Sequence, residues 1–112
     1  MLTINNKTMK VLSDLHKEYK FLVFGMLERG YTVSVSDSYR EKEYISKSNN
    51  YLDIKKYMDN LDETRIDFYK NGQYICECHN IHYNDDWETV SNMWGDYQIL
   101  EEICDIYHKA FR

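Results

Sequence analysis

The dipeptide Asn71-Gly72 constrains the fold of this chain more than any other short segment. It separates two runs with the composition of strands, "RIDFYK" and "QYICECHNIHY". Asn-Gly suits a type I′ turn, because both central residues of that turn need a positive φ, and the turn joins two antiparallel strands. Residues 65–83 are therefore predicted to form a β-hairpin.

Hydrophobic alternation predicts a second hairpin earlier in the chain. In "YTVSVSD", which begins at Tyr31, apolar and polar residues alternate. This is the pattern of a half-buried strand with one polar face. The polar connection "SYREK" follows, and "KEYISK" is the predicted returning strand.

Three segments have the apolar spacing of amphipathic helices. The first covers residues 8–29 and ends before Gly30, the second follows the capping residue Asn50 in "YLDIKKYMDNL", and the third is "YQILEEICDIYHKAF". The order of elements is therefore α-ββ-α-ββ-α. For 112 residues it predicts a single α+β domain, residues 1–112. Helices would cover one face of a four-stranded, mainly antiparallel sheet, in two layers.

Acidic residues are concentrated in the second half of the chain. The net charge is −5, and residues 71–108 contain eight carboxylates with no lysine or arginine. Such a segment repels phosphates, which argues against direct nucleic-acid binding, and it attracts a basic partner surface. The alternative is a solvated acidic surface that keeps a small protein soluble.

The segment "CECHNIH" contains cysteines and histidines, which are residue types that bind zinc. In a strand, however, Cys76, Cys78 and His82 lie on one face and His79 lies on the other. Cys76 and His82 would be ~20 Å apart at ~3.3 Å per residue, whereas zinc needs four ligands at ~2.0–2.3 Å. We therefore expect no metal site and no cofactor, and we interpret both cysteines as small apolar residues of the core face.

The chain lacks the residue patterns of common catalytic sites. Cys104 and His108 are four residues apart on the last predicted helix, but Cys104 borders its apolar face and no oxyanion donor is evident. The sequence also has no Gly-rich phosphate loop and no dinucleotide fingerprint. We therefore expect a protein without enzymatic activity.

The segment "NDDWETVSNMWGDY", residues 84–97, is the predicted partner-binding site. If it forms one or two helical turns, Trp87, Val90 and Trp94 share a face. Aromatic side chains then supply most of the binding energy and carboxylates steer a basic partner. Alternatively, at least one tryptophan seals the end of the core. The candidate partner-binding residues are Asp85, Asp86, Trp87, Glu88, Trp94 and Asp96.

Three features of the sequence indicate the cellular compartment of the protein. The N-terminal residues lack the apolar region of a signal peptide, and the longest apolar run, "FLVFGML", is too short to span a bilayer. Three cysteines, an odd number, fit a reducing compartment better than a disulfide framework. We therefore expect a soluble, cytoplasmic protein with no membrane association.

Three separate pieces of the chain together resemble a group of small phage and prophage proteins. The pattern of that group runs GYT-[IV]-SV-x-D, then TDE-x-x-L-x-F-x-x-x-x-G, then I-x-GND-x-x-DVISDY-x-D. The resemblance covers about residues 27–103 in matching order. Its matching positions are Gly30, Tyr31, Thr32, Ser34, Val35, Asp37, Asp62, Glu63, Phe68, Ile81, Asn84, Asp85, Val90, Ser91 and Asp96.

The chain departs from the group at two places. Ser38 follows Asp37 where the group usually has glycine, and "CECHNIH" replaces a run of plain apolar residues. The resemblance implies a phage origin and carries over no catalytic residue. It also implies a role shared by many short, acidic phage proteins, which act as stoichiometric inhibitors of host defence proteins or host enzymes.

The leading hypothesis is therefore a phage-encoded, anti-defence inhibitor in the host cytoplasm. Its partner would be a host nucleic-acid-binding effector with a basic surface, such as a CRISPR effector or a restriction enzyme. The acidic segment would occlude the basic groove as a nucleic-acid mimic.

Two other functions stay open. The protein could sequester a nucleotide signal, with a tyrosine stacked on the base and the phosphates near Lys7, Lys10, Lys17 and Lys20. It could also be a structural or dimerising phage accessory protein. The sequence does not determine the oligomeric state.

Overall fold

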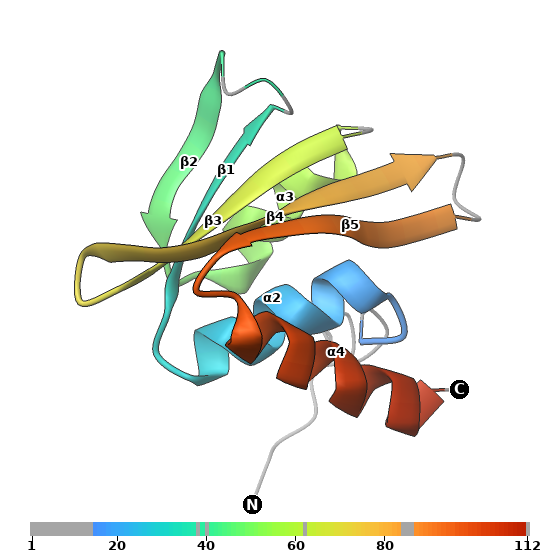
Figure 1. Ribbon diagram of the computed structural model, residues 1–112. Coiled ribbons are helices and arrows are strands. Elements are labelled where there is room, and N and C mark those ends of the chain that lie inside the picture. Colours follow the sequence, from blue (N-terminus) through green and yellow to red (C-terminus); the bar gives the residue numbers. More distant parts are fainter. Residues whose placement is uncertain (1–14, 38, 40, 62, 84–86, 112) are drawn as a thin grey trace, which may run out of the picture.

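The computed structural model describes residues 15–37, 39, 41–61, 63–83 and 87–111, with the backbone alone for residues 81–83 and 87–89. Figure 1 shows the elements in space. In chain order they are α2 (Glu18–Glu28), β1 (Thr32–Asp37), β2 (Glu43–Ser48), α3 (Tyr51–Asp59), β3 (Glu63–Lys70), β4 (Gln73–Tyr83), β5 (Trp87–Gly95) and α4 (Gln98–Phe111).

The strands form one antiparallel sheet with the order β2-β1-β3-β4-β5. The predicted α+β class and antiparallel sheet are confirmed. The predicted four strands and the order α-ββ-α-ββ-α are wrong in one detail, because a fifth strand, β5, follows β4 before the last helix. Pairing with β5 satisfies backbone groups of β4 that would otherwise lie at a sheet edge.

The described helices lie on the same side of the sheet (Figure 1). α3 packs against β1 and β2, and α2 packs against α4 and β5. One hydrophobic core joins helices and sheet, as the two-layer prediction requires. Its fully buried large side chains are Tyr19, Leu22, Val23, Met26, Val33, Val35, Ile54, Met58, Ile66, Phe68, Leu100 and Ile103.

The predicted hairpin around Asn71-Gly72 is confirmed. Asn71 has φ +53° and Gly72 has φ +79°, so both central residues of the turn have the positive φ that the sequence indicated. The register then shifts by one residue between Phe68 and Tyr69. This β-bulge pairs Phe68 with Cys76, and both side chains are fully buried in the core.

Local helix signals also have their expected structural counterparts. The Asn50 side chain accepts a hydrogen bond from the Asp53 backbone N–H at 3.2 Å and caps α3. Gly30 has φ +87° just after α2, which ends where the sequence indicated. The predicted part of this helix before Leu15 lies outside the described residues. None of the helices in the described ranges is long and apolar enough to cross a membrane.

Candidate partner-binding surface

The sheet face opposite the helices carries mostly polar side chains, and no helix in the described ranges covers it. We call this surface the open face. Alternation places its side chains between the core residues of each strand. The open face consists of Ser34, Ser36, Glu63, Arg65, Asp67, Tyr69, Glu77, His79, Asn92 and Trp94.

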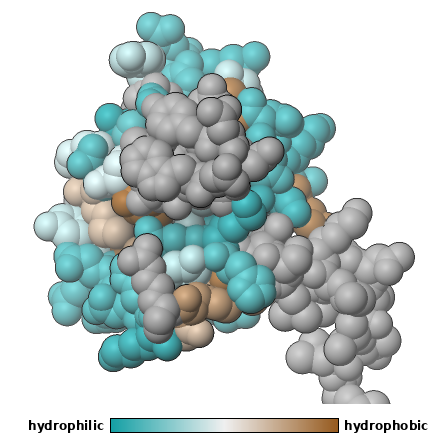
Figure 2. Space-filling view, turned by 90° about the vertical axis from the view of Figure 1, so that its right-hand side faces the viewer, coloured by the Kyte–Doolittle hydropathy of each residue, from teal (hydrophilic) through white to brown (hydrophobic). Residues whose placement is uncertain are grey.

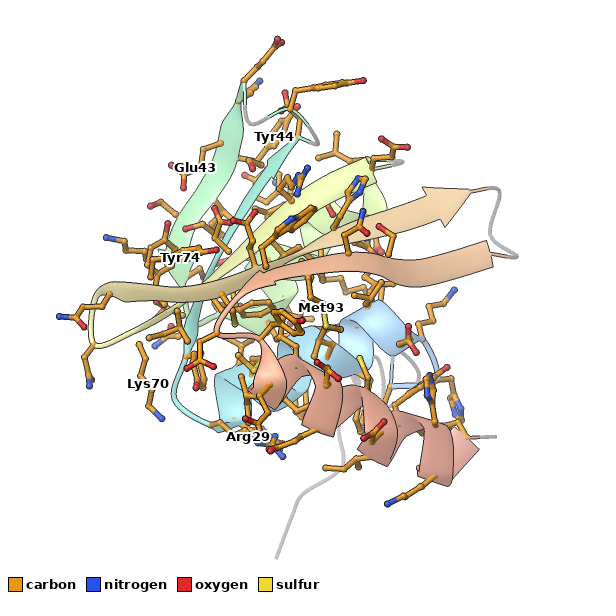
Figure 3. All side chains as sticks on the ribbon, in the orientation of Figure 1. Arg29, Glu43, Tyr44, Lys70, Tyr74 and Met93 are labelled. Atoms are coloured by element: carbon orange, nitrogen blue, oxygen red, sulfur yellow. The ribbon has the colours of Figure 1, made fainter. Side chains whose placement is uncertain are left out.

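Trp94 is the predicted site residue whose side chain lies on the open face. It pairs with Glu77 across β4 and β5, whereas the preceding Met93 pairs with the buried Cys78. Figure 3 shows Met93 directed from β5 toward the helices. Alternation therefore directs Trp94 away from the core, and 38% of its surface is exposed. This tryptophan does not seal the core.

The indole ring of Trp94 stacks with a cation. The Arg65 guanidinium carbon lies 4.1 Å from the Trp94 ring centroid, and Arg65 Nη1 lies 3.8 Å from Glu77 Oε2. The Tyr74 hydroxyl donates to Glu77 Oε1 at 2.7 Å and holds that carboxylate. Aromatic, guanidinium and carboxylate groups thus restrain one another before any partner binds.

The other predicted site residues are not gathered around Trp94. Asp85 and Asp86 lie outside the described residues. The backbones of Trp87 and Glu88 begin β5 opposite Tyr83 and His82, and their side chains lie outside the description.

Asp96 follows β5 in a turn of the backbone. Gly95 has φ +81°, and a Cβ atom there would lie 2.7 Å from the Ile75 carbonyl oxygen, so only glycine fits this close approach. The Asp96 N–H donates to the same carbonyl at 3.0 Å. Burial, followed by the carboxylates of Asp96 and Glu77, raises the pKa of Cys76 to about 12. Asp96 therefore lies near Cys76, which faces the core.

His79 lies beside Arg65 in the adjacent strand and was predicted only as a strand-surface residue. Its Nε2 lies 3.8 Å from Glu63 Oε2. Burial and the Arg65 guanidinium lower the pKa of His79, against the opposing effect of Glu63. These surroundings therefore favour the neutral imidazole over the imidazolium.

Carboxylates outnumber cations at the centre of the open face. β3 and β4 contribute Glu63, Asp67 and Glu77 there. The cations beside them are the Arg65 guanidinium and the Lys47 ammonium, whose Nζ lies 5.0 Å from the centroid of the Tyr69 ring. The predicted acidic segment is nevertheless not one surface. On α4, which lies on the helical side of the sheet, Glu101, Glu102 and Asp105 are exposed (Figure 1).

The described surface offers no broad apolar patch in the view of Figure 2. Hydrophobic residues form small separate areas among hydrophilic side chains there. Between α2 and α4, a cavity of about 230 Å³ has a mainly apolar lining that also includes two charged residues. It is lined by Leu15, Phe21, Phe24, Gly25, Glu28, Arg29, Ile103 and Ile106.

The structure describes part of the set of lysines named for nucleotide binding. Lys7 and Lys10 lie outside the described residues. Lys20 is 5% exposed, and its Nζ lies 2.6 Å from Asp59 Oδ1, so this ammonium group is already neutralised inside the protein.

The cysteines belong to the core, as their alternation predicted. Cys76 and Cys78 are fully buried free thiols, and Cys104 is 8% exposed. Burial and, to a smaller extent, Glu18 raise the pKa of Cys104 to about 12, while His108 Nε2 contacts Glu18 instead. Among the described residues, no group of three or more His, Cys, Asp or Glu side chains could hold a metal ion.

Comparison with known proteins adds no family to these observations. No model of a protein family, no curated protein sequence and no solved structure matches this chain.

Sequence reasoning missed Arg65 and Ser36 as members of the site. The alternation of "ETRIDFYK" carried a signal for Arg65, since it places Glu63, Arg65 and Asp67 on one face. Ser36 was predicted on the polar face of its strand and lies on that face, where it is 6% exposed.

Proposed function

We propose that this protein is a non-enzymatic binding protein whose open face docks onto a basic surface of a protein partner. The observation that carries the proposal is the exposed Trp94 ring, stacked with Arg65 among Glu63, Asp67 and Glu77. Tryptophan and arginine are the residues most enriched among those that dominate binding energy at interfaces.

Preorganisation favours this surface further. Arg65 is restrained by both Trp94 and Glu77, so little side-chain freedom is lost when a partner covers it. The surrounding carboxylates and the net charge of −5 speed association with a basic partner through long-range attraction. The exposed carboxylates of α4 contribute to this steering without touching the same partner surface.

The partner we propose is a nucleic-acid-handling protein of a bacterial host. The support is the resemblance to small phage proteins together with the lack of lysine and arginine in residues 71–108. The protein would act in the host cytoplasm as an anti-defence inhibitor. It would occlude a groove of lysines and arginines that otherwise binds DNA or RNA.

Affinity capture from bacterial lysate tests the proposal. We expect a basic, nucleic-acid-binding protein to be retained by the wild type and lost with Trp94→Ala. Tyr39→Ala is the matched control, because Tyr39 is 84% exposed in the β1–β2 connection and its replacement leaves the open face intact.

Salt and activity measurements then test the mechanism. Retention should weaken as the salt concentration rises, and the captured protein should lose nucleic-acid binding when this protein is added. Retention that is equal at low and high salt would exclude the electrostatic mechanism. Equal capture by Trp94→Ala and the wild type would exclude the open face.

A further inference from the structure

The cavity between α2 and α4 is apolar along most of its length and charged at one end. Aromatic and aliphatic side chains of both helices form most of its wall, among them Phe21, Phe24, Ile103 and Ile106. Glu28 and Arg29 line it at the C-terminal end of α2, where Figure 3 shows Arg29. A helix rises about 1.5 Å per residue, so Glu28 lies about 10 Å along α2 from Phe21. A ligand that suits this cavity is therefore amphiphilic.

The volume of the cavity limits the size of such a ligand. It measures about 230 Å³. A cavity of roughly 150 Å³ is large enough for benzene, whereas drug-sized molecules occupy pockets of about 300–1,000 Å³. The cavity between α2 and α4 thus has room for one aromatic ring or one branched aliphatic chain together with a small polar group.

The Arg29 guanidinium lies against the wall of the cavity at Gly25. Its Nη1 donates a hydrogen bond to the Gly25 carbonyl oxygen at 2.8 Å. A Cβ atom at residue 25 would lie 3.3 Å from this Nη1 and 3.1 Å from Ile103 Cγ2, so glycine leaves room for both side chains. A guanidinium has five N–H donors in a planar fork that matches a carboxylate. Arg29 can therefore bind a carboxylate while it keeps its bond to Gly25.

Glu28 supplies the opposite charge at the same end of the cavity. Its side chain is exposed, and none of the described residues forms an ion pair or a hydrogen bond with its carboxylate. The C-terminal end of a helix also carries a partial negative charge, which favours a cation. An ammonium group of the ligand is therefore complementary to Glu28, as a carboxylate is to Arg29.

We propose that this cavity binds a free α-amino acid with an apolar side chain, whose carboxylate pairs with Arg29 and whose ammonium pairs with Glu28. A free amino acid carries both charges next to its side chain, whereas a residue within a peptide has lost both to its amide bonds. The inference goes beyond the proposed function, because the cavity lies among the helices and the open face lies on the other side of the sheet (Figure 1).

Titration of the full chain with L-leucine, L-isoleucine, L-methionine and L-phenylalanine tests this inference. We expect one molecule to bind per chain for at least one of the four, with a dissociation constant below about 1 mM. Changes in NMR chemical shift should be confined to the lining of the cavity. Trp94→Ala should bind the same amino acid with unchanged affinity, so the result does not depend on the open face.

Two analogues of the ligand test the role of each charge. If phenylalanine binds, 3-phenylpropanoate lacks its ammonium and 2-phenylethylamine lacks its carboxylate. Each analogue should bind the wild type about fivefold more weakly, as expected for one ion pair at the mouth of a cavity. Arg29→Met should weaken binding of the amino acid to the level of the amine, and Glu28→Gln should weaken it to the level of the acid.

Glu101→Gln is the matched control for Glu28→Gln. It changes the net charge equally, but Glu101 is an exposed residue of α4 that does not line the cavity. This variant should leave the affinity for the amino acid unchanged.

Three results would overturn the inference. The first is no binding of any of the four amino acids up to about 10 mM. The second is an acid or amine analogue that binds as tightly as the amino acid itself, since one of the two charges would then have no role. The third is an equal effect of Glu28→Gln and Glu101→Gln, which would reduce the contribution of Glu28 to the net charge of the protein.

Discussion

The two serines of β1 offer a matched test of the open face in the free protein. Both face the same side of the sheet and both are nearly inaccessible, with 1% of Ser34 and 6% of Ser36 exposed. They differ in hydrogen bonding, since Ser34 Oγ accepts from the Lys47 N–H and Ser36 Oγ has no partner among the described residues. Replacement by alanine should therefore change stability in opposite directions.

The expected magnitudes follow from these contacts. Ser34→Ala breaks a hydrogen bond that holds Lys47, whose φ of +46° is costly for a residue other than glycine. We expect a loss of about 1–2 kcal/mol in the free energy of unfolding. Ser36→Ala removes a buried hydroxyl that gains nothing from folding, so we expect a gain of up to about 1 kcal/mol.

Urea denaturation followed by tryptophan fluorescence measures both changes. The two variants should differ by about 2 kcal/mol, which corresponds to roughly 8 °C in melting temperature for a domain of this size. The slope of the free energy with urea should stay constant, because neither change alters the surface exposed on unfolding. An equal loss of stability in both variants would refute the reasoning, since it would mean that Ser36 Oγ is hydrogen-bonded in the free protein.

Three other predictions concern charges in the described structure. A double-mutant cycle with Arg65→Met and Trp94→Leu should give a coupling energy of about 1 kcal/mol in urea denaturation, because the stacked pair is partly shielded from water. Asp59→Asn should destabilise by about 2 kcal/mol, since it removes the carboxylate that lies 2.6 Å from the buried Lys20 ammonium, whereas Lys20→Met should change stability by less than about 1 kcal/mol. The pKa of His79 is lowered in the folded protein, so the unfolded chain binds this proton more readily as the pH falls through 6.5. Stability should therefore decrease from pH 7 to pH 5 more steeply in the wild type than in His79→Gln, as measured by urea midpoints.

A specific result would contradict each of these three predictions. A coupling energy of zero would mean that Arg65 and Trp94 do not restrain each other. Equal losses for Asp59→Asn and Lys20→Met would mean that the ion pair itself, not the buried ammonium, determines the cost. If stability depended on pH equally in His79→Gln and the wild type, the pKa of His79 would not be lowered by folding.

Local sequence signals predicted the elements that depend on neighbouring residues. Asn71-Gly72 identified its hairpin because few dipeptides accept two successive positive φ angles. Asn50 identified the start of α3, because a side-chain oxygen three residues before a free N–H is sufficient to cap it. These signals act within a few residues and need no knowledge of the rest of the fold.

The same kind of reasoning did not predict strand β5 (Trp87–Gly95). Its spacing of Trp87, Val90 and Trp94 suits helical turns, yet residues 87–95 form β5. The free outer edge of β4 decides this outcome, since a strand there satisfies its backbone groups and buries Met93 toward the core. A free sheet edge exists only in the assembled fold, so the residues of one short segment cannot predict it.

The sequence predicted some of the residues of the open face, but it did not predict how they are arranged across the strands. The sequence by itself determined the antiparallel hairpins, the helices and the alternation that separates core from surface residues in each strand. The tertiary structure decided which residues meet across strands, because the bulge after Phe68 shifts β4 by one residue and pairs Arg65 with His79 instead of Cys78. A two-residue period makes each face predictable within a strand, but a shift of one residue exchanges the faces between strands. Trp94, Arg65, Ser36 and His79 therefore lie on one surface because of the register of the folded sheet.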